Sequence, residues 1–552
     1  MKKWKPFWIN KSYGIRQAIR RALLNVGLGA VNMGASLGFI LISKRLIDAV
    51  TGVTEFSVRE GIIILCVLAV VRLLFSMMYD YLEGRNEALT MMTMRKSFFD
   101  RLIRLRWDGT DRFHSGDAVN RVEEDVRVVV DFVTTKLSGF VLAGLQLILS
   151  SGLVFLMSPK LLLILVGFMA IAAVLGYVLY RPVSRLTRTI RQQDGLIQSH
   201  VQESIQNSVT VRVLFGAVRM SERLDQLQGK QYTDMMKRLN YSTFAQLCMR
   251  FGFLSGYTAA FIYGVLGIEQ GFVTFGMMAA LLQLVGQVQR PLAILVKLFP
   301  NTVRFLASDE RLAEIADCEQ EDDVPAISLQ APPTIRVEGV SFAYPGQQQM
   351  TLNGFSTVFP AGQMSAVIGE TGVGKTTLVR LMLALLEPSE GRITLDDVKV
   401  GIATRCNFMY VPQSGGLFSG SIRDNFLLMK PTATEEEMRE ALHVAAADFV
   451  FDLPKGLDTP CYEHGNGISG GQARRISLAC ALLHEGCVVI LDEATASLDN
   501  ETERVLLTRL KQYCAGNKTL IFVSHSDSVC RMADNVVDLG KKNCLDQSRQ
   551  FS

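Results

Sequence analysis

One stretch decides the fold of this chain: Gly369-Glu370-Thr371-Gly372-Val373-Gly374-Lys375-Thr376-Thr377. It fits the phosphate-binding pattern G-x-x-x-x-G-K-S/T. The apolar run 364–368 before it predicts a short buried strand, and the apolar stripe in 378–386 after it predicts a helix. In such a loop, glycines let backbone N–H groups point at phosphate oxygens, and the start of the helix adds positive potential.

The loop therefore predicts binding of a nucleoside triphosphate. We expect Lys375 to reach the β- and γ-phosphates and the Thr376 hydroxyl to hold Mg²⁺. A glycine-rich turn that binds nothing is the alternative, and the motifs farther along the chain weigh against it.

The bulk composition bounds the class of protein. A chain of 552 residues is too long for one ordinary core, so we expect at least two domains. Hydrophobic residues make up 49% of the chain and form long runs in its amino-terminal half. A net charge of +4 is small for this length and does not indicate a nucleic-acid partner. The ten cysteines form no C-x-x-C pair, which favours reduced cytosolic thiols over a zinc site or a disulfide framework.

Residues 1–316 predict an all-helical membrane domain. Six segments are apolar enough to span the ~30 Å hydrocarbon core, which takes about 20 helical residues. They lie at about 23–45, 61–82, 137–157, 161–181, 246–267 and 272–298. Residues 13–21 predict an amphipathic elbow on the inner membrane surface, ahead of the first span. A cleaved signal peptide is the alternative, but the first apolar run is too long for a signal core.

Two long connections, 83–136 and 181–245, are rich in arginine, which places them and the amino terminus in the cytoplasm. Six spans then leave the phosphate-binding motif in the cytoplasm as well. Apolar residues recur at helical spacing in both connections, so we expect the spanning helices to continue beyond the bilayer. Breaks near 113–117 and 208–216 predict short transverse helices. Solvated helical hairpins without a partner are the alternative.

Polar residues inside the predicted spans are candidates for a substrate cavity. Arg72 lies near the middle of the second span, where a charge costs roughly 2.5–3.5 kcal/mol on insertion scales, so it should face protein, water or substrate. Asn32 belongs to a polar stripe on the first span, and a second stripe on the sixth span contains Gln283, Gln287 and Arg290. Either stripe could line a cavity or join helices by hydrogen bonds.

The pattern changes after an acidic, proline-stopped segment at 317–333, which predicts a linker. From 334 to 552, short β-rich runs alternate with helices, as is typical of an α/β sheet domain. Tyr344 precedes the phosphate-binding loop by about 25 residues, where its ring could stack on adenine or pack at a strand end.

Two carboxylates end the apolar run 487–491. A strand buried on both faces would deliver Asp492 and Glu493 to the sheet edge beside the phosphates. We expect Asp492 to hold Mg²⁺ and Glu493 to act as general base on the attacking water. His525 follows the similar run 519–523 and could contact the γ-phosphate, although a lone histidine is more often structural. Gln413 ends another strand-like run and could offer its amide oxygen to Mg²⁺ and the water.

A second anion-binding pattern opens the predicted helix 473–483, in the residues Ile468-Ser469-Gly470-Gly471-Gln472. A serine and two glycines at a helix start present N–H groups to an anion. Because the chain already has a phosphate-binding loop, this second site makes sense if it closes on the ATP of another chain.

Together these motifs resemble those of the ATP-binding cassette (ABC) transporters, and the membrane half is similar to that of an exporter-type half-transporter. The resemblance covers nearly the whole chain. It implies a multi-domain fold in which an all-α six-helix membrane domain precedes an α/β P-loop ATPase domain. It assigns Tyr344 to adenine stacking and places Asp499 in a loop at the nucleotide. It also implies a dimer whose two cassettes clasp each ATP between 369–376 of one chain and 469–472 of the other.

The same resemblance assigns the transverse helices to coupling between the domains, and the second of them would dock on the partner's cassette. The coupling residues that it implies are Phe113, Gly116, Asp117, Val211, Phe215 and Glu463. The chain departs from the family pattern at Ile468, in place of leucine, and at Cys480, in place of a common arginine. Tyr462 replaces a common glycine, which leaves the local fold around Glu463 open.

We therefore expect an ATP-hydrolysing membrane transporter, with ATP and Mg²⁺ as cofactors, that exports or flips a lipid, peptide or drug-like substrate by alternating access. The alternatives are an importer of metal chelates, a nucleotide-gated channel or sensor, and a soluble cassette ATPase, which the spans disfavour. The expected partner is a second copy or a homologous half-transporter in the plasma (inner) membrane of a bacterium. Arg72 and Arg290 suggest an anionic group on the substrate.

Overall fold

The computed structural model describes residues 14–107, 115–296, 298–347, 349–413, 417–461, 468–495, 498–524 and 526–540. These residues divide into two compact units. The first lies within Met1–Asp100 and Asp117–Ala316, and the second within Arg101–Gly116 and Asp317–Ser552. A short segment from the membrane half of the sequence therefore belongs with the carboxyl-terminal unit.

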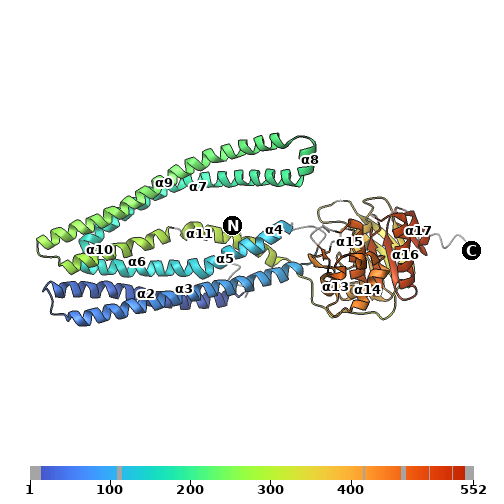
Figure 1. Ribbon diagram of the computed structural model, residues 1–552, viewed down its shortest axis with the longest axis horizontal. Coiled ribbons are helices and arrows are strands. Elements are labelled where there is room, and N and C mark those ends of the chain that lie inside the picture. Colours follow the sequence, from blue (N-terminus) through green and yellow to red (C-terminus); the bar gives the residue numbers. More distant parts are fainter. Residues whose placement is uncertain are drawn as a thin grey trace, which may run out of the picture. The chain divides into compact units, whose positions relative to one another are not determined.

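The first unit is built from helices throughout its described residues (Figure 1). Two π-helical turns, η1 and η2, interrupt the path from α4 to α6. The elements are α2 (Ile15–Val50), α3 (Val58–Ile103), α4 (Ser115–Asn120), η1 (Arg121–Asp125), α5 (Val126–Asp131), η2 (Phe132–Lys136), α6 (Leu137–Met157), α7 (Pro159–Gln206), α8 (Ser208–Val213), α9 (Ala217–Glu269), α10 (Phe275–Leu295) and α11 (Leu298–Asp317).

The prediction of an elbow at 13–21 ahead of the first span is wrong, because α2 runs without a break from Ile15 to Val50. Residues 15–22 contain no glycine or proline that would stop the helix. Ile15, Ala18 and Ala22 are buried, so this segment packs against the unit as the rest of the helix does.

The helices of the first unit pack in two groups. α7 and α9 lie side by side as a pair that α8 closes at one end, and α10 packs against α2, α6 and α9 (Figure 1). Leu161 and Leu165 of α7 meet Leu281 and Leu284 of α10 in a core where all four are buried. α7 has 48 residues and α9 has 53. At 1.5 Å per residue both helices reach roughly 70–80 Å, far more than the ~30 Å of a hydrocarbon core.

Four helical segments are long and apolar enough to cross a membrane: Ile15–Val50, Val58–Ile103, Gly116–Met157 and Ala217–Glu269. The other two predicted spans fall in α7, whose short apolar part is Pro159–Ile171, and in α10. Three glutamines and Arg290 lower the hydropathy of α10. The count of six spans stays a prediction.

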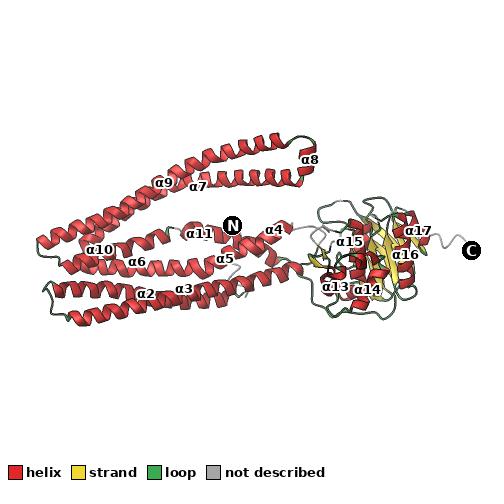
Figure 2. Cartoon of the chain, in the orientation of Figure 1, coloured by secondary structure: helices red, strands yellow, loops and turns green. Residues whose placement is uncertain are grey.

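The second unit is an α/β domain in which helices accompany three sheets (Figure 2). A parallel sheet has the order β11-β3-β10-β9-β6, an antiparallel sheet has the order β2-β1-β4-β5, and β7 pairs with β8. The strands are β1 (Ile335–Phe342), β2 (Leu352–Phe359), β3 (Met364–Ile368), β4 (Glu390–Leu395), β5 (Val398–Lys399), β6 (Phe408–Val411), β7 (Gly420–Ser421), β8 (Pro460–Cys461), β9 (Val488–Asp492), β10 (Thr519–Val523) and β11 (Asn535–Asp538).

The strand predictions at 364–368 and 519–523 are confirmed as β3 and β10. Every residue of β9 and β10 is buried, as continuous apolar runs predict for strands covered on both faces. The α-helices of this unit are α12 (Lys375–Met382), α13 (Ile422–Met429), α14 (Glu435–Val444), α15 (Gly470–Leu482), α16 (Asn500–Cys514) and α17 (Asp527–Met532). Shorter 3-10 turns are η3 (Ile402–Asn407), η4 (Asp448–Asp452) and η5 (Gly456–Asp458).

The predicted linker is fastened to this unit. The Glu321 carboxylate accepts two hydrogen bonds from the Arg405 guanidinium, at 2.8 and 3.0 Å. The backbone N–H of Leu329 donates to Asn407 Oδ1 at 2.7 Å. Because such bidentate contacts fix geometry, the linker follows the surface of the second unit up to β1.

Candidate functional site

The phosphate-binding loop lies between β3 and α12, as its sequence predicts. Gly369 has φ 146° and Gly374 has φ 109°, a backbone region that favours glycine. A β-carbon at Gly369 would lie 2.9 Å from Val373 Cγ1. Lys375 is only 7% exposed, and its ammonium donates to the carbonyl oxygens of Gly369 at 2.7 Å and Glu370 at 3.2 Å. The lysine at the end of the loop therefore bonds to the carbonyl oxygens at its start, and its ammonium group lies within the curve of the loop backbone.

Asp492 ends β9 directly beside Val523 of β10. It is 1% exposed, and its Oδ2 atom has no hydrogen-bond partner among the described residues. Burial and the neighbouring Glu493 carboxylate raise the pKa of Asp492, while Arg380 and Thr376 oppose that rise. A buried carboxylate oxygen without a partner, next to a threonine hydroxyl, is the donor set that Mg²⁺ prefers. These residues fit the expected metal.

Glu493 follows Asp492 with a left-handed backbone, at φ 50°. Such a conformation is strained for a glutamate and persists where surrounding contacts hold it. Its N–H donates to the Val523 carbonyl at 2.9 Å, and its Oε2 accepts a hydrogen bond from Gln413 Nε2 at 2.5 Å. The structure therefore brings two of the predicted catalytic residues, Gln413 and Glu493, together beside Asp492. His525, the third, lies outside the described residues.

Tyr344 belongs to the same site. Its hydroxyl lies 3.1 Å from Thr377 Oγ1, on the first turn of α12. Its ring meets Phe342 edge to face, with ring centres 5.1 Å apart. The tyrosine that the family resemblance assigns to adenine stacking is thus hydrogen-bonded to the helix that starts at the phosphate-binding loop.

The turn at 468–472 is exposed at Ser469 and Gly470. Ser469 caps α15: its Oγ accepts from the N–H of Gln472 at 3.3 Å, and Gln472 Oε1 accepts from the N–H of Ser469 at 3.0 Å. Asp499 is likewise exposed and caps α16 through the N–H of Thr502 at 2.9 Å, which lowers the pKa of its carboxyl. Both caps face solvent within the single chain.

The second predicted transverse helix is confirmed as α8, at the end of the α7 and α9 pair. Phe215 is 90% exposed and has φ 51°. Val209, Val213 and Leu214 are also exposed, whereas Val211 is half-buried. The tip therefore presents an apolar surface to its surroundings. Of the other coupling residues, Phe113 and Glu463 lie outside the described residues.

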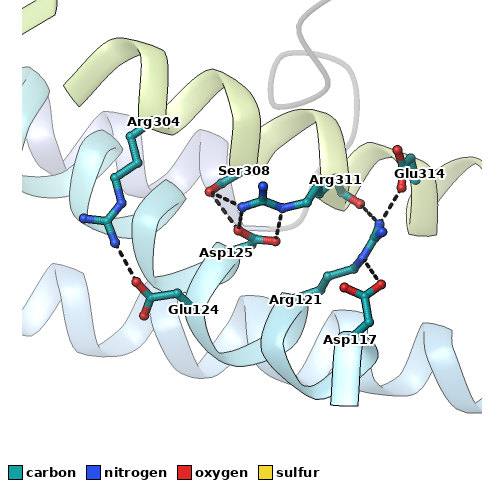
Figure 3. Close-up of polar contacts among 8 residues, drawn as sticks. All are labelled: Asp117, Arg121, Glu124, Asp125, Arg304, Ser308, Arg311 and Glu314. Carbon is teal, nitrogen blue, oxygen red and sulfur yellow. Dashed lines mark hydrogen bonds and ion pairs between the residues drawn. The ribbon is translucent and has the colours of Figure 1, made fainter. Parts of the chain in front are cut away.

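Asp117 and the exposed Gly116 lie on α4, where a group of ion pairs joins α4 and η1 to α11 (Figure 3). Arg121 donates to Asp117 at 2.8 Å and to Glu314 at 2.6 Å. Asp125, only 1% exposed, accepts from Ser308 Oγ and from Arg311 Nε, both at 2.8 Å. The predicted coupling residue Asp117 is thus part of a network of ion pairs that holds α11, the helix before the linker, against α4 and η1.

The candidate cavity residues behave differently from one another. Arg72, Gln283 and Arg290 are exposed within this chain. Asn32 is half-buried, and Gln287 donates to Ser36 at 3.4 Å and contacts the Gln146 amide on α6. Gln287 thus makes the interhelical hydrogen bonds that the sequence left as one of two possibilities.

Sequence reasoning missed two arginines of this site. Arg380 on α12 donates to the Tyr344 hydroxyl at 3.1 Å. Arg474 on α15 donates to the carbonyl oxygens of Gln413 at 3.2 Å and Glu493 at 3.4 Å. The only sequence signal was a long cationic side chain within a motif helix, because both contacts join segments far apart in the chain.

The fold and the site together define a class of protein, a helical membrane domain fused to a P-loop ATPase. Family models agree: residues 23–292 match the model of the ABC transporter transmembrane region, and residues 352–496 match the model described as ABC transporter. An ATP-dependent lipid A-core flippase of Desulfotalea psychrophila is 30% identical over 448 residues, covering 79% of this chain and 77% of that protein. A flippase of the same name from Shewanella frigidimarina is 29% identical, covering 93% and 90%.

Two further similarities extend over nearly the whole chain. An uncharacterised ABC transporter ATP-binding protein of Bacillus subtilis is 26% identical and covers 95% of this chain and 88% of that protein. The solved structure of a bacterial Atm1-family ABC exporter with ATP bound has a TM-score of 0.77 at 22% identity, covering 96% and 95%. The chain belongs to the ABC transporter family. It is an ATP-hydrolysing, multi-pass membrane transporter with the fold of an exporter half-transporter.

Proposed function

We propose that this chain forms half of a dimeric exporter, which uses ATP to move an anionic, lipid-like substrate out of the inner leaflet of a bacterial plasma membrane. The observation that carries this proposal is the exposed apolar tip of the α7 and α9 pair. A machine of this kind needs a surface that transmits the closure of one cassette to the membrane helices of the other chain.

The tip has the properties of a docking surface. Phe215 is 90% exposed, and Val209, Val213 and Leu214 are 73%, 69% and 72% exposed. Single exposed apolar residues are ordinary, but four gathered at the end of a long helical pair mark an interaction site. The occupant that we propose is the cassette of a second copy, because a half-transporter supplies one membrane domain and one cassette and needs a second of each.

ATP would hold the two cassettes together. The adenine would stack on Tyr344, and the phosphates would bind the curl around Lys375 while the partner's serine–glycine turn covers them. Thr376, Asp492 and Gln413 would hold Mg²⁺, which neutralises phosphate charge when bound. Glu493 would then accept a proton from the attacking water, and His525 would hold that water in line.

The energy required is within reach of this arrangement. Shifting a two-state equilibrium from 1:99 to 99:1 takes ~5.5 kcal/mol of differential binding, or about half of that from each of two ATP molecules. Hydrolysis would remove the contact that each ATP makes between the two cassettes, so the closed dimer would open again.

The substrate class rests on the exposed arginines. An unpaired charge facing lipid in the middle of a span is costly, so Arg72 and Arg290 are better accounted for by an anionic group inside a cavity. The relatives named as lipid A-core flippases make lipids the first class to compare. If Arg72→Ala leaves the stimulation of ATPase activity by anionic lipids unchanged, this assignment of the substrate fails.

Two variants at one position test the coupling. Phe215→Leu keeps an apolar side chain, whereas Phe215→Asn removes it and tolerates the left-handed backbone. In proteoliposomes we expect the asparagine variant to lose at least about tenfold in transport per ATP hydrolysed, the size expected when an interface loses an aromatic anchor. The leucine variant should stay near the parent. Equal transport by both variants would contradict the proposed docking.

A further inference from the structure

A short segment after α3 lies against the cassette. Residues 101–107 cluster with the second unit, although α3 itself starts in the first. The N–H of Arg106 donates to the Glu319 carbonyl at 3.0 Å, and the N–H of Glu321 donates to the Arg104 carbonyl at 2.9 Å. Trp107, at the end of this segment, packs against the apolar core that contains β1 and α12. The last turn of a membrane helix thus continues into a strap on the ATPase domain.

Trp107 touches one charged side chain of the nucleotide site. The guanidinium carbon of Arg380 lies over the indole, 4.6 Å from the ring centre. Cationic groups at this distance from an indole face are attracted by the ring and, for arginine, stack as planes. Among the described residues Arg380 makes no ion pair, so the indole and its hydrogen bonds are what orient it.

Arg380 in turn holds Tyr344. Its Nη1 donates to the Tyr344 hydroxyl at 3.1 Å, and the same hydroxyl is 3.1 Å from Thr377 Oγ1. Phe342 supports the tyrosine ring from its edge. The hydroxyl is therefore fixed by two groups of α12, and one of those groups leans on the strap.

We propose that Arg380 is a positioning residue that sets the ring of Tyr344 for adenine stacking, and that Trp107 links this setting to the end of helix α3. The inference rests on the proposed function, in which Tyr344 binds adenine. A movement of α3 that pulls Trp107 away frees the guanidinium, and the tyrosine loses one of its two anchors. The membrane domain thereby tunes nucleotide affinity from the side of the base, in addition to acting on the phosphates.

The geometry favours this role over simple packing. A half-buried arginine with a purely structural role would be expected to pair with a carboxylate. Arg380 instead donates a hydrogen bond to the Tyr344 hydroxyl and stacks on the Trp107 indole. One side chain thus contacts both Tyr344 and the indole of the strap.

The test is steady-state ATPase kinetics of the full chain in lipid nanodiscs. Arg380→Gln and Trp107→Ala should each raise KM for ATP by roughly 3- to 10-fold, the size expected when base–aromatic stacking is weakened in part. kcat should change less than KM. Arg380→Lys, which keeps the charge but not the planar fork, should fall between the parent and Arg380→Gln. Arg392→Gln is the matched control, since Arg392 is an exposed arginine of the same unit that pairs with Glu338.

A second background separates positioning from damage. When Tyr344 is already replaced by alanine, adding Arg380→Gln should raise KM no further, whereas a folding defect would add to it and appear as a lower Tm. An unchanged KM in Arg380→Gln, or a full further rise in the Tyr344→Ala background, overturns the inference. Lys375→Ala is run beside these variants: hydrolysis that survives it would instead overturn the proposed function itself.

Discussion

The phosphate-binding loop and the turn at 468–472 are both glycine-rich helix starts, but only the first is completed within its own chain. In the loop, Lys375 is buried and bonded to two carbonyl oxygens, and Thr377 is 4% exposed. In the turn, Ser469 and Gly470 are exposed, and the serine bonds only to its own helix. The lysine of the loop is enclosed by its own chain, whereas the turn is an exposed helix start whose side-chain hydrogen bonds are those of its own cap.

This difference has a consequence for mechanism. An exposed helix start can direct its positive potential at an incoming anion. Lys375 is already buried, so we expect it to lose little further hydration when it exchanges its carbonyl contacts for phosphate. Nucleotide binding to the loop can therefore come first, and association of the second chain through the turn can follow.

The largest effect is expected from a variant that removes the general base and leaves both helix starts unchanged. Glu493→Gln should lower hydrolysis by about 10³-fold, within the 10²–10⁴ range for a general base, because the amide cannot accept the proton from water. ATP should still bind, so nucleotide is retained in a closed dimer. Single-turnover hydrolysis and retained radiolabelled ATP measure the two effects. Glu485→Gln, on an exposed glutamate, is the control. Hydrolysis above a tenth of the parent rate in Glu493→Gln would rule out this role.

The second prediction tests the turn itself. Ser469→Ala removes a helix cap and the proposed phosphate contact, whereas Thr434→Ala removes only a cap, in the same type of capping box at α14. Both should cost ~1 kcal/mol of stability. Only Ser469→Ala should also lower kcat, by roughly 10- to 100-fold, as for a lost donor to developing charge. Equal ATPase rates in the two variants would mean that the turn does not touch nucleotide.

Much of the cassette was predictable from its sequence because its elements are specified locally. The strands at 364–368 and 519–523 are continuous apolar runs, and sheets buried on both faces need such runs. The loop follows a spacing that glycine geometry requires. Gln413 and Glu493 were predicted separately, each at a strand end, and the parallel pairing of β6 with β9 brings them together.

The rest depended on contacts that no local pattern encodes. Arg380, Arg474 and Trp107 act through the tips of long side chains on segments far apart in the chain. The segment 13–21 was expected to form an elbow ahead of the first span, but an elbow needs a breaking residue, and none lies within 15–22. The buried Asp125 gave no signal either, since its partner Arg311 is 186 residues away.

A third prediction concerns a side chain of α15 that contacts the two residues beside Asp492. Arg474, two residues after the turn, donates to the carbonyl oxygens of Gln413 and Glu493. Arg474→Gln should lower kcat by about 3- to 10-fold, because the bonds are charge-assisted but long and partly exposed. ATP affinity should change less. Stopped-flow binding and steady-state rates separate the two, with the exposed Arg504→Gln as control. An unchanged kcat would show that the contacts of Arg474 with Gln413 and Glu493 do not contribute to hydrolysis.

The smallest expected effect lies beneath the phosphate-binding loop. Asp534 accepts from Lys511 Nζ at 2.7 Å and from the N–H of Met364, the first residue of β3, at 3.0 Å. The Lys511 contact and then the Met364 N–H hold the pKa of Asp534 below its usual value. A carboxyl with a lowered folded-state pKa contributes its full stability above about pH 4 and loses it as the pH falls through the lowered pKa.

Asp534→Asn should therefore lower Tm slightly at pH 7, by the equivalent of less than ~1 kcal/mol, since the ion pair is partly exposed. The gap between variant and parent should close as the pH falls below about 4. Because β3 leads into the phosphate-binding loop, the variant should weaken binding of ATP by single chains no less than it weakens dimer formation. Thermal unfolding across pH, with and without nucleotide, measures both, and a gap that widens in acid would contradict the assignment of the charge.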